Sequence, residues 1–303
     1  MEFKQLEAFV QISKLQSFSK ASEALFLTQP ALSSQINALE KEIGTQLFIR
    51  STKKVFPTKA GINFYGYAQK MLALRDQSLC EMGNYSKECA GEINILASSV
   101  PSQYMLPQLI ADFNKEYPNI IFRLYQKDSG GVFEELIQYQ YDIGFVGTET
   151  ESYRYKLSSL CKDQLVLILP KDMEYTGKQS AEEASRFITD KSFIMREQGS
   201  GTREALKGFL SKNGILEKDL RVIAYFSSTQ GIMEAVSQGL GISFVSRVAA
   251  KVYENMNRIN IVEIESEQLN RDIFYVQKKD MILTPAQELF VGYAKKCYQN
   301  VKS

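Results

Sequence analysis

The stretch from Ser17 to Thr58 constrains the fold of this chain more than any other, because it contains closely spaced signals for helix ends and helix starts. The polar run 17–19 ends a first helix and opens a second one. Thr28 is placed to cap a third helix, since its hydroxyl can accept a hydrogen bond from a free amide of the first turn. Pro30 is tolerated only in such a first turn, which fixes where this helix begins.

The third helix has one apolar face and one polar face. Its apolar stripe repeats at intervals of four, three and four residues: Leu32, Ile36, Leu39 and Ile43. The opposite face carries short uncharged donors and acceptors: Gln29, Ser33, Ser34 and Asn37. Such side chains suit a helix that approaches base edges in the major groove of DNA. Gly44 is expected to end this helix.

A small basic segment follows the third helix. Residues 47–49 and 55–56 could form two short strands around a tip at 50–54. Between positions 50 and 59 the chain has four basic residues and no acidic one: Arg50, Lys53, Lys54 and Lys59. This local charge of +4 in a chain of net charge +1 can neutralise DNA phosphates. A solvated turn is the alternative, but the neighbouring helix pair favours a DNA-binding wing.

The segment from Leu6 to Gly61 resembles the winged helix-turn-helix of the LysR-type transcriptional regulators. The motifs that carry the resemblance are Ser17-Phe18-Ser19-Lys20-Ala21-Ser22, Leu27-Thr28-Gln29-Pro30-Ala31-Leu32-Ser33-Ser34-Gln35-Ile36, Leu47-Phe48-x-Arg50 and Thr58-x-Ala60-Gly61. The resemblance implies a recognition helix from Gln29 to Glu42 and a wing arginine, Arg50, directed at the minor groove or its phosphates. Many family members carry a basic residue where this chain has Ser34. The candidate DNA-binding residues are Thr28, Gln29, Pro30, Ser33, Ser34, Asn37, Arg50, Lys53, Lys54 and Thr58.

A long helix is expected from about Lys59 to Lys87, with Thr58 as its cap. Its broken apolar stripe consists of Phe64, Tyr67, Ala68, Met71, Leu72, Leu74, Leu79 and Met82. A lone helix would leave this stripe in water, so we expect it to pair with the same helix of a second chain and to present two recognition helices to two half-sites. The resemblance makes it the family's linker helix and favours a dimer. Packing against the chain's own C-terminal part is the alternative.

Beyond Gly91 the pattern changes to alternating strands and helices, which is typical of mostly parallel sheets wound with helices. The expected strands are 93–97, 120–125, 143–146, 165–169, 193–195, 222–226 and 242–245, and the expected helices are 106–116, 133–139, 204–210 and 233–238. This part resembles the family's effector domain, an α/β domain of two lobes with the type II periplasmic-binding-protein plan.

The expected domain organisation has three parts. They are a winged helix-turn-helix at 1–58, a linker or dimerisation helix at 59–90, and an effector-binding domain at 91–303. Within the last part, lobe I is expected at about 91–161 and 267–303, and lobe II at about 162–266. The chain would then cross twice between the lobes. A chain of 303 residues with 44% hydrophobic content is long enough for about two such domains.

Four loops after predicted strands are candidates for an effector site between the lobes, at 98–103, 147–149, 196–203 and 226–231. Strand ends and helix N-termini meet in such a cleft, and their free amides favour an anion. The candidate effector-binding residues are Ser98, Ser99, Ser102, Gln103, Thr148, Gly199, Ser200, Gly201, Thr202, Arg203, Ser228 and Thr229. For any single loop, ordinary turn and capping chemistry is the alternative.

The chemistry of these loops favours a small solute. The Gly-Ser-Gly-Thr-Arg run at 199–203 is neither a dinucleotide fingerprint nor a P-loop, because it lacks the glycine and lysine positions of those motifs. Arg196 and Arg203 could pair with a carboxylate, a sulfate or a sulfonate-like group, or each could belong to a structural ion pair. The serine- and threonine-rich loops are similar to those of family members that sense sulfur-containing anions or their precursors. The sequence also leaves aromatic and aliphatic carboxylates open as effectors.

An enzymatic function is disfavoured by the side chains available. The chain has no histidine, which excludes Ser-His-Asp and Cys-His catalysis. The carboxylate pairs at 134–135 and 182–183 are adjacent on predicted helices and therefore point to different faces. A solute-binding protein or an enzyme that uses the two-lobed domain is the remaining alternative. Removing residues 1–90 would separate these ideas, because only a regulator would lose DNA binding.

The four cysteines are Cys80, Cys89, Cys161 and Cys297. Their spacing fits no metal site, so we expect free thiols, no metal and no cofactor, with a redox switch as the alternative. The start of the chain lacks the apolar core of a signal peptide, and no run reaches the roughly 20 apolar residues of a membrane span. We therefore expect a cytoplasmic protein.

Together these observations predict a dimeric or tetrameric LysR-type regulator, and no enzyme. Its partners would be double-stranded DNA with an interrupted palindromic promoter site, a second copy of the chain, and a small anionic effector. The resemblance further implies that closure of the two lobes changes the placement of dimers, the bend of the promoter and the contact with RNA polymerase. The residues leave open which effector binds, which genes respond and whether they are activated or repressed.

Overall fold

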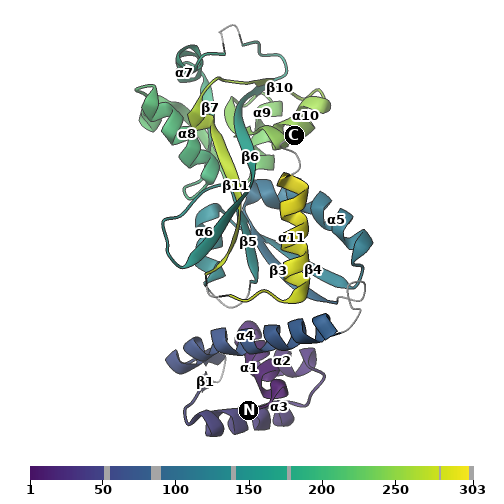
Figure 1. Cartoon of the computed structure of the whole chain (residues 1–303). Coiled ribbons are helices and arrows are strands. Elements are labelled where there is room, and N and C mark those ends of the chain that lie inside the picture. Colours follow the sequence, from purple (N-terminus) through teal and green to yellow (C-terminus); the bar gives the residue numbers. More distant parts are fainter. Residues whose placement is uncertain (51–54, 83–89, 138–140, 176–178, 280, 300–303) are drawn as a thin grey trace.

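The computed structural model of the chain describes residues 1–50, 55–82, 90–137, 141–175, 179–279 and 281–299. A helical N-terminal head lies below a two-lobed α/β body (Figure 1). The predicted fold class, a winged helix-turn-helix followed by a two-lobed α/β domain, is confirmed.

The head folds around a small apolar core. Its elements are α1 (Phe3–Leu15), α2 (Phe18–Ala24), α3 (Gln29–Ile43), β1 (Phe48–Arg50), β2 (Val55–Pro57) and α4 (Lys59–Met82). The core contains the fully buried Phe9, whose ring lies 5.2 Å from the ring of Phe48 in the antiparallel β1–β2 hairpin. The inward stripe of α3 supplies Leu32, Ile36 and Leu39 to this core.

The predicted helix ends are confirmed. The Ser17 hydroxyl accepts a hydrogen bond from the Lys20 amide at the start of α2, over 3.3 Å. Thr28 caps α3 in the same way by accepting from the Ala31 amide over 3.3 Å. Gly44 ends α3 with a φ of 78°, in the left-handed region that favours glycine.

Helix α4 divides its apolar side chains between two faces. Ala68 is buried in the core of the head, where Phe64, Met71 and Leu72 also pack. Tyr65 and Ala73 are buried as well, whereas five apolar side chains are exposed: Ile62, Tyr67, Leu74, Leu79 and Met82. The predicted broken apolar stripe is therefore divided between positions that pack in the head, where α4 contacts α1, and exposed positions, and α4 also contacts α11 of the body. The predicted continuation of this helix to residue 87 lies outside the described residues.

The body is built on one sheet of seven strands and a separate pair. Its strands are β3 (Gly91–Ala97), β4 (Ile120–Gln126), β5 (Ile143–Val146), β6 (Tyr155–Pro170), β7 (Ser192–Arg196), β8 (Arg221–Phe226), β9 (Ser243–Ser246), β10 (Ile259–Val262) and β11 (Asn270–Lys278). The large sheet has the order β10-β6-β11-β5-β3-β4, with β9 also paired to β6. Strands β7 and β8 pair in parallel, and an isolated bridge joins Phe193 to Ile242.

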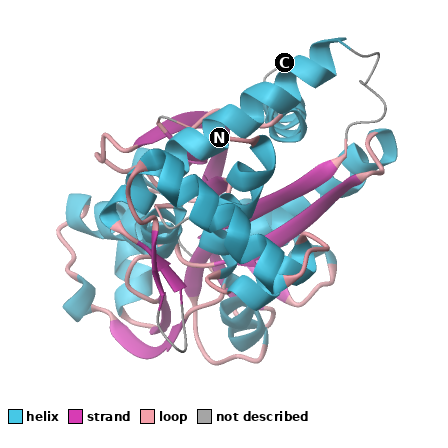
Figure 2. Ribbon diagram, turned by 90° about the horizontal axis from the view of Figure 1, so that it is seen from below, coloured by secondary structure: helices cyan, strands magenta, loops and turns pink. Residues whose placement is uncertain are grey.

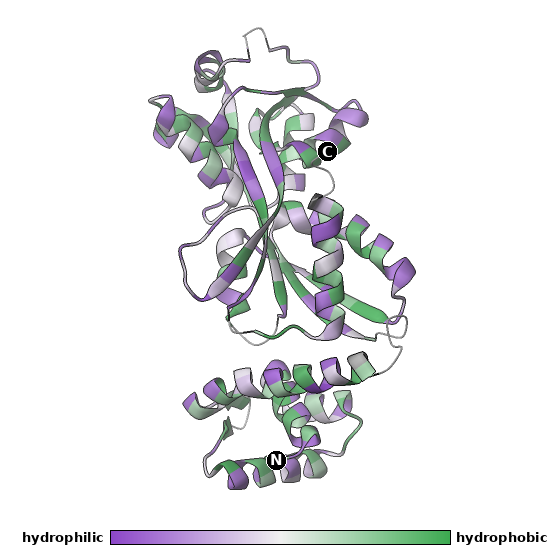
Figure 3. Ribbon diagram, in the orientation of Figure 1, coloured by the Kyte–Doolittle hydropathy of each residue, from purple (hydrophilic) through white to green (hydrophobic). Residues whose placement is uncertain are grey.

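Helices lie beside the strands in both lobes (Figure 1), and in the view from below the helices of the head lie in front of the body (Figure 2). The helices of the lobes are α5 (Leu106–Glu116), α6 (Ser129–Leu136), α7 (Ala181–Thr189), α8 (Gly201–Lys212), α9 (Thr229–Ser237), α10 (Arg247–Asn255) and α11 (Pro285–Gln299), with a π-helical turn at Pro101–Met105. Their apolar sides and the strands form separate cores in the two lobes, one around Phe113 and Phe290 and one around Phe209 and Phe244. In the hydropathy view the strands carry much of the apolar character (Figure 3).

The prediction of mostly parallel sheets is wrong for the strands that join the lobes. Strands β3, β4 and β5 are parallel, but β11 is antiparallel to both β5 and β6, and β9 and β10 are antiparallel to β6. Strand β6 begins at Tyr155, ten residues before the predicted start at Leu165 (165 − 155). Its first half mixes exposed and buried positions, which hides it from a search for apolar runs. The two crossings between lobes are made by β6 and β11 (Figure 1).

Candidate functional site

The candidate DNA-reading face belongs to α3, on the side of the head that points away from the body (Figure 1). Gln29, Pro30, Ser34 and Asn37 are exposed, and Ser33 is partly exposed. Because the apolar stripe of α3 is buried in the head, these polar residues are held outward as a set. The arrangement offers uncharged donors and acceptors to a DNA groove.

The basic wing is described only in part. Residues 51–54, which include the candidates Lys53 and Lys54, lie outside the described residues, as does the side chain of Arg50. Thr58 closes the wing onto α4. Its hydroxyl accepts from the Gly61 amide over 3.0 Å and donates to the Gln46 carbonyl over 2.7 Å. Thr58 thereby fixes the angle between the wing and the linker helix.

A second polar site lies between the two lobes. The cavity that remains there is about 10 Å3, and it is lined by Ser98, Ser99, Val100, Asp128, Ser129, Arg196, Ser200, Gly201, Thr202 and Arg271. Ser98 and Asp128 follow strands of lobe I, and Arg196 and Thr202 follow or end a strand of lobe II. The strand ends of both lobes thus converge on one small space, as the sequence predicted for the cleft.

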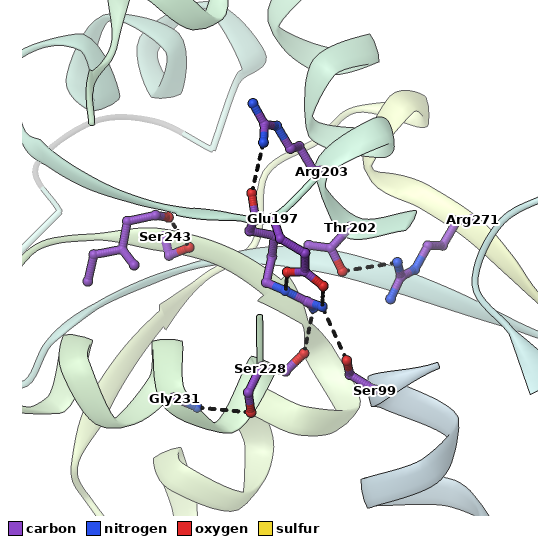
Figure 4. Close-up of polar contacts among 11 residues, drawn as sticks. Ser99, Glu197, Thr202, Arg203, Ser228, Gly231, Ser243 and Arg271 are labelled. Atoms are coloured by element: carbon purple, nitrogen blue, oxygen red, sulfur yellow. Dashed lines mark hydrogen bonds and ion pairs between the residues drawn. The ribbon is translucent and has the colours of Figure 1, made fainter. Parts of the chain in front are cut away.

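Arg196 is the centre of this site. Its guanidinium is almost completely buried and makes a bidentate ion pair with Glu197, through Nε to Oε2 at 2.7 Å and Nη2 to Oε1 at 2.8 Å. Its Nη1 donates to Thr229 Oγ1 over 3.0 Å, and its Nη2 donates to Ser99 Oγ over 3.2 Å (Figure 4). Because Ser99 belongs to lobe I, Arg196 connects the lobes directly.

A second buried arginine enters from the crossing strand β11. Arg271 pairs with Asp163 through Nε at 2.9 Å and Nη2 at 2.8 Å, and both side chains are buried. Its Nη1 donates to Thr202 Oγ1 over 3.1 Å (Figure 4). Asp163 also accepts from the Ser246 hydroxyl over 2.7 Å. Asp163 therefore balances the charge of Arg271. The edge of the guanidinium that does not contact Asp163 faces the interlobe space.

The lobes approach each other closely around this space. The Gly130 amide of lobe I donates to the Gly199 carbonyl of lobe II over 3.4 Å. A Cβ atom added at Gly201 would lie 2.8 Å from the Gly147 carbonyl oxygen, so only a hydrogen fits there. Gly199 has a φ of 84° and lies against Asp128 in the same way. The structure is therefore a closed form of the cleft.

Helix α8 begins at the site without a side-chain cap. Ser200 is its N-cap residue, and its hydroxyl makes no capping hydrogen bond to the first turn. By contrast, Asp128 caps α6 by accepting from the Gly131 amide over 2.8 Å. Uncapped first-turn amides and the helix dipole together favour an anion at this end of α8.

The predicted effector residues separate into those at the space and those around it. Ser98, Ser99, Ser200, Gly201 and Thr202 line it. The others are not among its lining residues: Ser102, Gln103, Thr148, Gly199, Arg203, Ser228 and Thr229. Thr229 and Gly199 are in direct contact with lining residues.

Several of these surrounding residues have structural partners. The Ser102 hydroxyl and the Gln103 amide both donate to Gln126, over 3.0 and 2.8 Å. Ser228 caps α9 by accepting from the Gly231 amide over 3.4 Å (Figure 4). For the arginine at 203, the sequence left open a ligand contact or an ion pair, and the structure shows the ion pair.

Arg203 pairs with Glu217 through Nε at 2.9 Å and Nη2 at 3.0 Å, and its Nη1 donates to the Arg196 carbonyl over 3.2 Å. The hydrogen bond with Glu217 is the main influence that raises the pKa of Arg203, and the same bond lowers the pKa of Glu217. Arg203 therefore supports the end of β7 and does not line the space.

The sequence prediction missed Asp128, Ser129 and Arg271. Asp128 and Ser129 are the second and third residues after β4, and Ser98 and Ser99 are the first and second after β3, so the strand-end rule could have found them. Arg271 had no comparable signal. It reaches the site because β11 pairs with β6, and that pairing joins residues more than 100 positions apart in the sequence.

The cysteines that the structure describes with their side chains are Cys161 and Cys297, and both are free thiols. Burial raises the pKa of the Cys161 thiol to about 11, so it is protonated and unreactive near neutral pH. Cys89 and the side chain of Cys80 lie outside the described residues. Within the described ranges, no cluster of histidine, cysteine or acidic residues is suited to hold a metal ion.

None of the helices that the structure describes combines the length and the apolar character needed to cross a lipid bilayer.

Two protein families match this chain. Residues 3–62 match the family described as "Bacterial regulatory helix-turn-helix protein, lysR family", and residues 86–297 match "LysR substrate binding domain". The uncharacterized HTH-type transcriptional regulator MJ0300 of Methanocaldococcus jannaschii is 35% identical over 274 residues, which cover 90% of this chain and 91% of the relative. The HTH-type transcriptional regulator CysL of Bacillus subtilis is 31% identical over 300 residues, 99% of each chain.

Among solved structures, a full-length OxyR variant from Pseudomonas aeruginosa has a similar fold. The TM-score is 0.77 at 19% identity, and the match covers 99% of this chain and 95% of that one. The helical head, the linker helix and the two lobes thus occur together in a known arrangement.

Proposed function

The chain belongs to the LysR family of transcriptional regulators, and we propose that it binds an interrupted palindrome in promoter DNA while its interlobe site senses a small anion. Regulators of this family bind DNA and small-molecule effectors and form oligomers. The family membership favours regulation over an enzymatic or free solute-binding role. The observation that carries the effector proposal is the buried Arg196, which joins hydroxyls of both lobes at one small space.

The chemistry of the interlobe space supports a small anionic effector. In this closed form the cavity is about 10 Å3, far below the roughly 300–1,000 Å3 of ligand sites, so the lobes must separate before an effector enters. Arg196, Arg271 and the uncapped start of α8 supply positive potential, while Ser98 and Thr202 supply hydroxyl donors. An oxyanion such as a sulfate-like or short carboxylate group matches these donors, and a sulfur-containing anion is our first candidate.

The carboxylates at the site further restrict the charge that the ligand can carry. Glu197 and Asp163 already neutralise the two arginines, and Asp128 adds a third carboxylate. A ligand of high negative charge would meet these carboxylates at close range. The balance therefore favours a monoanion or a zwitterion with one acidic group.

The exposed face of α4 supports a dimer. Tyr67 and Leu74 lie seven residues apart on one side of this helix and remain exposed, Leu79 is exposed further round it, and Tyr67 also lines the hollow between α4 and the body. Pairing of these faces in two chains would bury them and place two α3 helices on one side of the dimer. In our proposal, lobe closure around the effector changes the spacing of such dimers, the bend of the promoter and its contact with RNA polymerase.

Selection from a random duplex pool with the full-length protein tests the DNA part of the proposal. We expect the selected sequences to contain two half-sites with dyad symmetry. Arg50→Ala should weaken binding to every sequence and reduce the salt slope by about 1, whereas Gln29→Ala should relax discrimination between half-sites. An Arg50→Ala protein with an unaltered salt slope would contradict the wing assignment.

Thermal unfolding of the full-length protein with sulfate, thiosulfate, O-acetylserine and simple carboxylates tests the effector part. A ligand at about 100 times its Kd adds roughly 2.7 kcal/mol to stability, which raises the Tm by several degrees. Thr202→Ala should abolish the shift, and Thr189→Ala on the distant α7 should preserve it. If no anion in this panel shifts the Tm, the proposed ligand class is wrong.

A further inference from the structure

The turn between α2 and α3 places an aromatic residue in a backbone position that favours glycine. The Leu27 amide donates to the Ser22 carbonyl over 2.9 Å, and the Phe26 amide donates to the Glu23 carbonyl over 3.2 Å. This pair of hydrogen bonds is the Schellman motif that ends many helices. Phe26 occupies its left-handed position with a φ of 54°. For a residue with a Cβ atom, that conformation is costly.

Phe26 gains no burial in return for this strain. Its side chain is 96% exposed, the largest exposed fraction among the exposed large apolar side chains of the described residues. The other two helix ends of the head in the left-handed region are Gly44 after α3, with a φ of 78°, and Gln16 after α1, with a φ of 51°, so neither places a large apolar side chain there. A strained backbone that carries a fully exposed aromatic ring indicates that the ring itself has a role outside the folded chain.

The position of Phe26 identifies the surface that the ring meets. It lies two residues before Thr28, the N-cap of α3, and therefore within about 7 Å of the start of the recognition helix along the chain. Every residue from 26 to 31 is exposed. Phe26, Leu27, Pro30 and Ala31 make the edge of this run apolar. Neither a charge nor a strong donor is present among them that would recognise phosphate.

We propose that Phe26 is a DNA-contacting residue that packs its ring on an apolar part of the operator beside the recognition helix. The apolar parts of a DNA groove are the 5-methyl group of thymine and the deoxyribose edge, and phenylalanine is one of the side chains that contacts thymine methyl groups. The proposal rests on the proposed function, because it requires that α3 reads DNA. It adds an apolar, sequence-sensitive contact to a face that otherwise carries short polar groups.

The test is the substitution Phe26→Gly in the full-length protein. Glycine removes the ring and fits the left-handed position, so the Tm should rise by roughly 1–4 °C. Affinity for a duplex that the wild-type protein selects from a random pool should fall about 5- to 10-fold. Stability and DNA binding therefore move in opposite directions, which a purely structural role of Phe26 cannot produce.

Two matched variants serve as controls. Asn257 ends α10 in the same motif, with a φ of 55° and hydrogen bonds from its own amide and from the Arg258 amide, but it lies in the body. Asn257→Gly should leave DNA affinity unchanged. Phe26→Tyr keeps the ring and should keep the affinity of the wild type within about twofold.

Uracil in place of each thymine of the selected duplex locates the contact. If the ring meets a thymine methyl group, one uracil weakens binding of the wild type and has no further effect on Phe26→Gly. If it meets deoxyribose, Phe26→Gly weakens binding equally on both duplexes. Undiminished affinity of Phe26→Gly for the selected duplex overturns the proposal. Failure of the wild-type protein to select any duplex would instead contradict DNA recognition by α3.

Discussion

Lys14 Nζ lies 3.5 Å from Asp142 Oδ1, and this ion pair joins helix α1 of the head to the residue that precedes β5 in lobe I. Asp142 is buried, and its other oxygen accepts from the backbone amide of Asn94 over 2.8 Å and from its side-chain amide over 3.3 Å. The carboxylate therefore ties two neighbouring strands of lobe I and contacts the DNA-binding head at the same time. A movement of these strands would be transmitted to α1 through this ion pair.

The first prediction concerns this contact. A double-mutant cycle with Lys14→Ala and Asp142→Asn should give a coupling of about 0.5–1 kcal/mol in the free energy of unfolding, because one partner is buried and the other is mostly covered. Urea unfolding of the full-length protein measures it. The exposed pair of Lys115 and Asp112 provides the comparison and should give a smaller value. A coupling of zero between Lys14 and Asp142 would show that this contact between the head and lobe I does not form in solution.

A second prediction follows from Lys278, which lines the hollow between α4 and the body. Burial lowers the pKa of Lys278 to about 8, Asp142 acts in the opposite direction, and Lys14 lowers the pKa further. The unfolded chain has a lysine pKa near 10.4, so between about pH 8 and 10.4 it binds more protons than the folded chain. Stability contributed by this group must therefore rise with pH through that window and stay constant below it.

Urea midpoints at pH 7.5, 9 and 10 measure this effect. Lys278→Met should flatten the rise of stability with pH, because this substitution removes the amine that loses its proton more easily in the folded state. Lys279→Met changes the same charge at an exposed neighbouring position and should keep the rise. An unchanged pH dependence in Lys278→Met would place the titration elsewhere.

The parts of the fold that the sequence predicts are those set by local chemistry. Ser17, Thr28 and Gly44 fix helix ends through hydrogen bonds or backbone angles within a few residues, and these predictions are confirmed. Strand β6 is different. Its first half pairs with β11 and alternates with polar residues, so its extent depends on a partner more than 100 positions away that no local pattern reveals.

The same distinction applies to the interlobe site. Ser99 and Thr202 were found because they follow strands or begin helices, which are local features. The contacts that make them a site are not local: Arg196 reaches Ser99 across 97 positions, and Arg271 reaches Thr202 across 69. Arg203 belongs to the same loop as Thr202, yet it turns to Glu217. Sequence identifies the loop, whereas packing decides which of its side chains enter the space.

A third prediction tests the buried pair of Asp163 and Arg271. Asp163→Ala leaves the guanidinium buried without its carboxylate and removes the partner of the Ser246 hydroxyl. The expected loss is about 3–5 kcal/mol in the free energy of unfolding. Lys162→Ala breaks the neighbouring exposed pair with Asp272 and should cost less than about 1 kcal/mol. A small loss in Asp163→Ala would mean that water reaches this pair in the resting protein.

The fourth prediction asks whether the cleft of the free protein is closed in solution, as it is in the structure. Gly201 and Gly208 both lie on α8, but they differ in what a methyl group would meet. At Gly201 it would lie 2.8 Å from the Gly147 carbonyl oxygen of lobe I, whereas at Gly208 nothing lies within 4 Å. Gly208→Ala should raise the stability by about 0.5–1 kcal/mol, because alanine favours the helix.

Gly201→Ala should instead lower the Tm by a few degrees, since the backbone oxygen of Gly147 cannot move aside without separating the lobes at Arg196 and Ser99. Thermal unfolding of both variants without added ligand measures the difference. If Gly201→Ala is as stable as Gly208→Ala, the lobes rest apart in solution and closure must be induced by the effector. If Gly201→Ala is destabilised, the free protein already holds the closed form, and an effector must separate the lobes to enter, because the closed cavity of about 10 Å3 has room for no more than about one water molecule.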